Sequence, residues 1–283
     1  MYIDTHTKMS MEHSICNYLE IVPAKLNRLF DQAQQAAQTG SRFDCCIFDE
    51  IINEFVALKL PSHNYIDQIL FYHLSRRLNS ECECNIGSNL FDLLTTKNSV
   101  SIFLKEHDVE FIPDGGRLEL LYKGRKVPLN DSMESSIPYL KGRLGHNHFR
   151  ADYCFNGFML KDLIYRNTYA RALFGAPEFI ESLGNFLHRT DLLNDYLENS
   201  TYYCFEYKVP LHKVLFDQEE KLSNSSKPLY LINRVLHRLF EYYTSDLRYM
   251  SDHGNPIIRL MDDDTMLEKY FILKEEITYE MLE

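Results

Sequence analysis

The chain lacks tryptophan and contains little glycine and proline: its 283 residues include no Trp, 11 Gly and 9 Pro. It has no apolar run near the ~20 residues that cross a bilayer, and its first residues lack the basic start and apolar core of a secretory signal. A hydrophobic content of 45% excludes the composition of disordered chains. We therefore expect a folded, cytoplasmic protein without a membrane partner, and delivery by a secretion system stays open.

The cysteines do not form a recognisable pattern. Seven is an odd number, and their scatter suits reduced thiols better than a disulfide framework. The two close pairs, Cys45-Cys46 and Cys82-Glu83-Cys84, do not have the Cys-x2-4-Cys spacing of structural zinc sites. The sequence therefore predicts no metal site.

Charge and aromatic content limit the partners. The formal net charge is −11, so the protein as a whole repels phosphate backbones, and we expect no non-specific nucleic-acid binding. The chain has 19 Tyr and 18 Phe. Tyrosine is enriched at protein interfaces, and such a composition would suit a partner surface.

The first third of the chain has a helical pattern. Apolar residues recur at three- and four-residue steps from about residue 11 to 94, with breaks at Gly40 and Pro61. The pattern predicts three or four helices, the third of which covers Ile66 to Leu74. We assign residues 1–98 to a helical region that recognises a target or regulates activity.

The chemistry changes after residue 98. Two apolar runs flank Asp114-Gly115-Gly116 and predict a hairpin, and residues 202–209 and 268–277 are typical of strands. Residues 137–144 and 148–160 are strand-like or irregular, whereas residues 161–187 and 228–243 have helical patterns. The fold class expected is α+β: an N-terminal helical region followed, over 99–283, by a mixed, mainly antiparallel sheet with helices.

Three groups of residues are candidates for a site. The first is a basic segment with two glycines that could hold a diphosphate through charge-assisted hydrogen bonds, or that could equally be a solvated turn. Its members are Arg143, His146, His148, Arg150 and Asn156.

The second group is Ser200-Thr201, at the head of the strand over 202–209. These hydroxyls could order a carboxylate or a ribose, or they could simply cap a turn. The third is Glu268, which we place on the first residue of an inner strand. There a carboxylate could face a cleft and stabilise a developing positive charge.

Residues 140–283 resemble the ADP-ribosyltransferase fold. The order of a basic or His-bearing segment, a Ser/Thr-bearing strand and a Glu-bearing late strand is similar to that family, as are the endings over 203–217 and 268–282. The resemblance implies cleavage of NAD as substrate and a role as a bacterial toxin, effector or defence protein. It places Glu268, Ser200 and Thr201 in the catalytic site and Arg143, His146, His148, Arg150 and Asn156 around NAD.

The chain departs from the family at one position. Met266 stands two places before Glu268, where the family carries an acidic residue or Gln. The departure argues against modification of protein arginine, and it leaves a nucleic-acid, small-molecule or degenerate activity open.

Two alternatives belong to other classes. The first is a non-enzymatic, acidic, Tyr-rich binding protein of the immunity or adaptor type. The second is a HEPN-like ribonuclease, which needs Arg143 and His148 on a single helix. An enzyme should gather Glu268, Ser200-Thr201 and the segment 143–150 around one pocket, whereas a binding protein would leave them dispersed.

Overall fold

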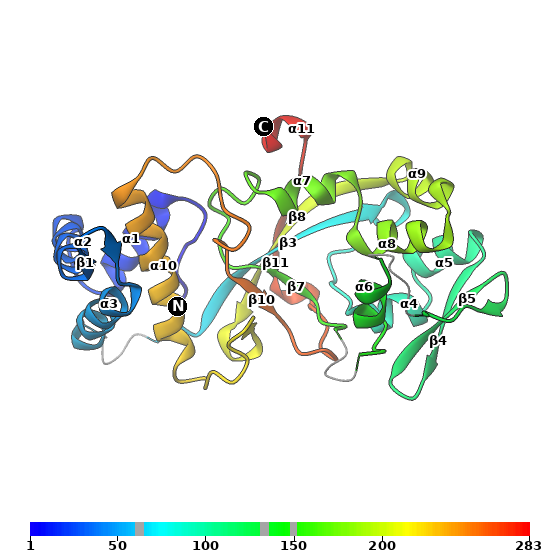
Figure 1. Ribbon diagram of the computed structural model, residues 1–283, viewed down its shortest axis with the longest axis horizontal. Coiled ribbons are helices and arrows are strands. Elements are labelled where there is room, and N and C mark those ends of the chain that lie inside the picture. The colour runs from blue at the N-terminus through cyan, green and yellow to red at the C-terminus, as the bar shows by residue number, and fades with distance from the viewer. Residues whose placement is uncertain (60–64, 131–135, 148–151) are drawn as a thin grey trace. The chain divides into compact units, whose positions relative to one another are not determined.

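The fold is α+β, with N-terminal helices followed by antiparallel sheets, as the sequence predicts (Figure 1). The computed structural model describes residues 1–59, 65–130, 136–147 and 152–283. In these ranges no helix combines the length and apolar character that a bilayer crossing requires.

The helices are α1 (Lys8–Tyr18), α2 (Pro23–Ala37), α3 (Cys45–Lys59), α4 (Leu90–Thr95), α5 (Ser99–Glu106), α6 (Ser136–Arg143), α7 (Thr168–Gly175), α8 (Glu178–Leu187), α9 (Thr190–Glu198), α10 (Lys227–Thr244) and α11 (Tyr279–Leu282). Three short 3-10 turns are η1 (Asn79–Glu81), η2 (Leu211–Lys213) and η3 (Glu268–Tyr270). The strands are β1 (Gln38–Thr39), β2 (Arg42–Phe43), β3 (Gln68–Leu78), β4 (Val109–Asp114), β5 (Arg117–Tyr122), β6 (Arg125–Lys126), β7 (Asn156–Phe158), β8 (Ser200–Pro210), β9 (Leu215–Phe216), β10 (Ile257–Arg259) and β11 (Phe271–Glu276).

The chain forms two compact units, each assembled from three segments. The first unit comprises Met1–Tyr72, Phe158–Arg166 and Lys208–Ile258, and the second comprises His73–Gly157, Asn167–Tyr207 and Arg259–Glu283. The assignment of a target-recognising or regulatory region to 1–98 and of a transferase-like domain to 99–283 stays a prediction.

Helices α1, α2, α3 and α10 build the first unit (Figure 1). Helix α10 buries Leu231, Val235 and Leu239 at four-residue steps, as the sequence predicts for residues 228–243. Aromatic rings join three of the helices, because Phe240 of α10 lies 4.4 Å from Phe48 of α3 and 5.6 Å from Phe30 of α2. This ring cluster fixes α2 and α3 on α10.

The largest sheet has the strand order β11-β8-β3-β7-β10-β9, so β11 is an edge strand. Strands β11 and β8 are antiparallel, with Phe271 opposite Tyr207 and Glu276 opposite Tyr203. Strand β8 covers Ser200–Pro210 and confirms the strand expected over 202–209. The alternation along it puts Tyr203, Phe205 and Tyr207 on one face.

A second core in the second unit lies against a three-stranded sheet, β4-β5-β6. The hairpin expected around Asp114 is confirmed, with Gly115 and Gly116 at φ of +59° and +87°. Only glycine adopts such angles without strain, which explains the Gly-Gly pair in the turn. Leu104, Val109 and Leu183 are among the buried residues of this core.

The structure differs from the sequence predictions at Ile66 to Leu74 and at residues 137–144. Ile66 to Leu74 does not form a helix, because residues 68–78 are strand β3, whose Leu70, Phe71 and Tyr72 are all buried. A strand buried on both faces lacks the polar alternation that distinguishes strands from helices. Residues 137–144 were expected to be strand-like or irregular, but Ser136–Arg143 is helix α6, which buries Ile137 and Leu140.

Candidate functional site

Arg143 and His146 bind groups of the protein itself. Arg143 is the last residue of α6, and its Nη1 donates to Asp152 Oδ2 at 2.8 Å. Burial opposes the charge of this guanidinium, but the neighbouring Asp152 outweighs burial and raises the pKa of Arg143. His146 Nε2 lies 2.8 Å from the carbonyl oxygen of Leu118 and donates to it. Both side chains therefore hold loops of the second core.

The remaining basic candidates, His148 and Arg150, lie outside the described residues. The geometry of a HEPN-like ribonuclease needs one helix through residues 143 and 148. Helix α6 ends at Arg143, and Gly145 follows at φ +75°, outside the helical region.

Ser200 and Thr201 begin β8 and are bound by neighbouring side chains. Ser200 is 7% exposed, and its hydroxyl oxygen accepts from Arg76 Nε at 3.0 Å. Arg76 also donates to the backbone oxygens of Phe174, Leu197 and Ser200. The hydroxyl of Thr201 donates to Asn79 Oδ1 at 2.9 Å. Both hydroxyls therefore contact side chains that are far away in the sequence, and neither of these two contacts is a local turn cap.

Glu268 lies in η3, before β11, and is exposed. The expectation that it begins an inner strand is wrong, because β11 starts at Phe271 and lies at the sheet edge. The register also separates it from the hydroxyl pair: Phe271 is opposite Tyr207, whereas Ser200 lies seven residues away, about 23 Å along the strand at ~3.3 Å per residue. The structure does not bring Glu268 and Ser200 together.

The backbone oxygen of Asn156 contacts His73, a histidine that was not a candidate from the sequence. The Asn156 carbonyl on β7 lies 2.7 Å from His73 Nδ1 on β3, and a carbonyl only accepts, so Nδ1 carries the proton. Burial, with repulsion from the Arg77 guanidinium, lowers the pKa of His73 from 6.5 to about 3. The imidazole is therefore neutral near pH 7, with a lone pair on Nε2.

A β-bridge brings the chain before Glu268 to the residues that surround His73. Gly87 and Met266 exchange backbone hydrogen bonds of 3.0 and 2.8 Å. Gly87 touches the Phe155 ring so closely that a Cβ at this position would lie 2.3 Å from it, and the Phe155 ring centre is 4.1 Å from that of His73. Glu268 follows Met266 by two residues, so the chain that leads to Glu268 lies beside the Gly87–Phe155 layer on which His73 packs.

Aromatic and basic side chains extend the same face of β3 and β8, which we call the His73 face. The Arg77 guanidinium lies 4.9 Å from the Phe205 ring centre, and Tyr207 stacks on Phe205 at 6.3 Å. Tyr207 donates to the Asn85 carbonyl at 3.0 Å. Arg77 Nε and Asn85 Oδ1 are buried, and neither has a hydrogen-bond partner among the described residues.

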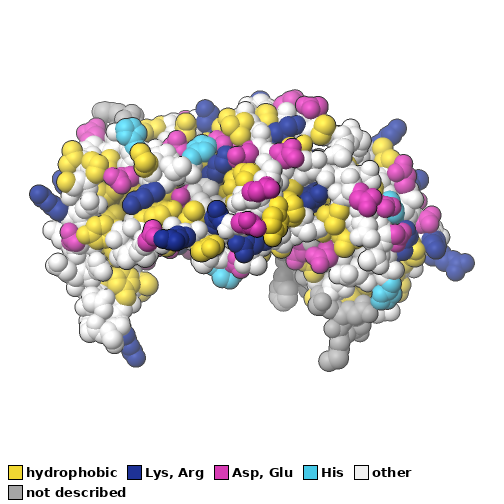
Figure 2. Space-filling view, turned by 90° about the horizontal axis from the view of Figure 1, so that it is seen from above, with side chains coloured by type: hydrophobic (Ala, Val, Ile, Leu, Met, Phe, Trp, Pro, Cys, Tyr) yellow, Lys and Arg dark blue, Asp and Glu magenta, His cyan; other side chains and the backbone are white. Residues whose placement is uncertain are grey.

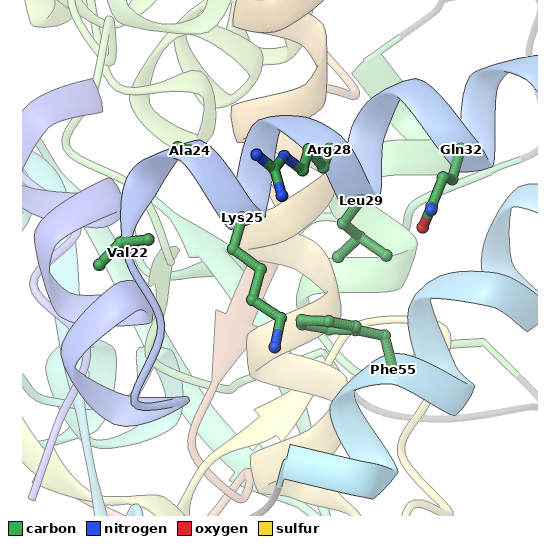
Figure 3. Close-up of a pocket in the computed structure, with 7 residues that line it drawn as sticks. All are labelled: Val22, Ala24, Lys25, Arg28, Leu29, Gln32 and Phe55. Carbon is green, nitrogen blue, oxygen red and sulfur yellow. The ribbon is translucent and has the colours of Figure 1, made fainter.

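Two cavities lie in the first unit. One of about 400 Å³ lies between α2 and α3 (Figure 3), and one of about 270 Å³ is lined by residues of α1, α2 and α10. None of the predicted site residues lines either of them. On the face shown in Figure 2, acidic and basic side chains are interspersed, with hydrophobic ones among them.

No protein-family model, no curated protein and no solved structure matches this chain.

Proposed function

We propose that the second unit binds NAD on the His73 face and cleaves its nicotinamide–ribose bond, as an ADP-ribosyltransferase-like enzyme of the toxin, effector or defence type. One observation carries the proposal: a neutral, oriented His73 packs on the Phe155 ring, and the Gly87–Met266 bridge at the same ring lies two residues before the exposed Glu268. An imidazole and a carboxylate acting together can bind a ribose and stabilise positive charge.

His73 orients the substrate. Its Nδ1–H is held by the Asn156 carbonyl, so Nε2 is an acceptor, and a ribose hydroxyl can donate to it. A neutral ring is required for this role, because an imidazolium has no lone pair with which to accept a hydrogen bond. The low pKa of His73 meets this requirement.

Glu268 stabilises the transition state. As the bond from ribose C1′ to the nicotinamide nitrogen breaks, the electron pair leaves with neutral nicotinamide, and positive charge develops on the ribose. An acceptor oxygen or nitrogen, or water, then attacks C1′ and releases a proton. A carboxylate near C1′ favours the charged state over the bound ground state, and this difference is the source of the rate increase.

Two buried polar groups without hydrogen-bond partners among the described residues are suited to bind the nicotinamide leaving group. Arg77 Nε is a donor and Asn85 Oδ1 an acceptor, both buried without a partner among the described residues. A buried polar group without a partner costs about 1 to 3 kcal/mol, and a ligand that satisfies it recovers that free energy. The carboxamide of nicotinamide offers one acceptor and one donor, so we place it at residues 77 and 85, with a shift of the Asn85 loop to admit it.

This proposal changes the roles assigned from the sequence. Glu268 and Asn156 remain in the proposed site, and His73 is added to it. Ser200, Thr201, Arg143 and His146 serve the fold through their contacts with Arg76, Asn79, Asp152 and Leu118.

The test is an assay of nicotinamide release with purified protein and NAD. Wild-type protein should release nicotinamide, Glu268→Gln should lose this activity, and His73→Ala should weaken NAD binding. Glu276→Gln is the matched control, since it removes one exposed carboxylate from the neighbouring strand. Equal turnover in Glu268→Gln and Glu276→Gln would remove Glu268 from the mechanism.

A partner-binding protein without catalysis is the second candidate. The dispersal of Glu268, Ser200 and Arg143 favours it, because each has different neighbours and they line no common cavity among those described. The two candidates separate on one titration. Absence of NAD binding at millimolar concentration would exclude the enzyme and favour the partner-binding protein.

A further inference from the structure

The groove between α2 and α3 of the first unit is lined by apolar and basic side chains (Figure 3). Val22, Leu29 and Phe55 provide apolar surface, and Lys25, Arg28 and Gln32 provide its polar groups. Its volume of about 400 Å³ is within the range of pockets that bind small molecules or single side chains. No acidic residue lines it.

The two cations of the groove, Lys25 and Arg28, have no acidic partner in the part of the chain that the structure describes. Lys25 and Arg28 are exposed, and among the described residues neither forms an ion pair. The Lys25 amine points toward the Phe55 ring, 5.9 Å from its centre (Figure 3). A chain with a net charge of −11 thus presents two unpaired cations at this one groove.

Exposed apolar side chains occur on both helices that bound the groove. Val22 is 64% exposed at the start of α2, and Leu58, one turn after Phe55 on α3, is 84% exposed. An apolar groove between two helices with charges at its rim is the geometry that receives the apolar face of an amphipathic helix. The positive rim selects acidic residues on the flanks of that helix.

We propose that this groove docks an acidic amphipathic helix of a partner protein. An apolar anchor of the partner lies on Leu29 and Phe55, and partner carboxylates pair with Lys25 and Arg28. Charge complementarity favours an acidic occupant, because a basic helix would bring no pairing with Lys25 and Arg28.

The experiment uses fluorescence anisotropy with the full-length protein and a labelled designed helix. The probe carries Leu or Phe at positions i, i+4 and i+7 with Glu on its flanks, and its twin carries Lys in place of Glu. The acidic probe should bind, more weakly at high salt, and the basic twin should not. Equal binding of both probes, or no binding of the acidic one, would overturn the proposal.

Two variants locate the site. Lys25→Glu/Arg28→Glu should weaken binding at least about tenfold, which corresponds to 1.4 kcal/mol. Arg42→Glu/Lys221→Glu makes the same charge change at exposed positions of the first unit outside the groove, and it should leave binding nearly unchanged. If the control weakens binding equally, net charge and not the groove recruits the probe.

Val22→Ser tests the apolar contact without loss of folding. Val22 is the N-cap of α2 and makes no side-chain cap, whereas serine is a favourable N-cap residue. The variant should therefore fold at least as well as wild type and bind the acidic probe more weakly. Unchanged affinity would contradict the apolar contact, and dimerisation that the probe cannot displace would make a second copy the occupant.

Discussion

The basic side chains of the two units differ in what they bind. In the second unit, Arg76 and Arg143 donate to oxygen atoms of their own unit, and Arg77 lies on an aromatic ring. In the first unit, Lys25 and Arg28 line a groove and pair with no acid among the described residues. The first set stabilises the fold, and the second is available to a partner. The sequence alone does not distinguish basic residues that stabilise the fold from those that line the groove.

The largest effect should come from Arg76, whose guanidinium holds Ser200 and three backbone oxygens. Arg76→Met leaves these acceptors without donors and should lower the free energy of unfolding by about 2 to 4 kcal/mol. Urea denaturation measures this. Arg42→Met, at an exposed arginine, is the control, and an equal loss in both variants would end the distinction between bound and available arginines.

Substitution of Gly87 tests its close packing against the Phe155 ring. A Cβ at this position meets the Phe155 ring at 2.3 Å, so Gly87→Ala should destabilise the protein by about 1 to 3 kcal/mol. Gly175→Ala, where a Cβ meets nothing within 4 Å, should leave the unfolding free energy unchanged or slightly higher. If Gly87→Ala leaves the unfolding free energy unchanged, Gly87 and the Phe155 ring are packed less closely than this distance implies.

Acid should destabilise the second unit through His73. Its pKa is about 3 in the folded protein and near 6.5 when unfolded, so below pH 6.5 the unfolded chain takes up a proton that the folded one does not. Stability should therefore fall between pH 6.5 and pH 4 by about 1 to 2 kcal/mol, after allowance for the partial exposure of the ring. Between pH 6.5 and pH 4, the urea midpoint of the His73→Phe variant should fall less steeply than that of the wild-type protein.

Ser200 separates support of the fold from catalysis. Ser200→Ala removes one hydrogen bond to Arg76 and should cost about 1 kcal/mol of stability. Thermal denaturation measures the loss, and nicotinamide release should not change. Lost turnover in a stable Ser200→Ala protein would instead place Ser200 in the catalytic site.

The smallest effect belongs to the groove. Lys25→Glu/Arg28→Glu breaks no ion pair among the described residues and should alter the unfolding free energy by no more than about 0.5 kcal/mol. Chemical denaturation of the variant against wild type provides the measurement. A loss above 1.5 kcal/mol would assign these cations to the fold and not to a partner.

The sequence predicted the elements whose patterns are local. Strand β8 alternates, α10 repeats every three or four residues, and two glycines mark the β4–β5 turn, so each was recognisable. Strand β3 was not, because Leu70, Phe71 and Tyr72 are buried in succession and resemble a buried helix.

The site was less predictable for the same physical reason. His73 lies inside this apolar run, and its hydrogen-bond partner Asn156 is 83 residues away. The Gly87–Met266 bridge, which lies two residues before Glu268, joins residues that are even further apart in sequence. The sequence pointed instead to the basic segment and to the Ser200-Thr201 pair. In the structure, Arg143, Ser200 and Thr201 bind other groups of the protein itself.

The most direct test of the account is nicotinamide release from NAD by wild-type protein and by Glu268→Gln, with Glu276→Gln in parallel. The account predicts release by wild type and by Glu276→Gln and none by Glu268→Gln, with all three proteins equally stable. No binding and no release by wild-type protein at millimolar NAD would contradict it.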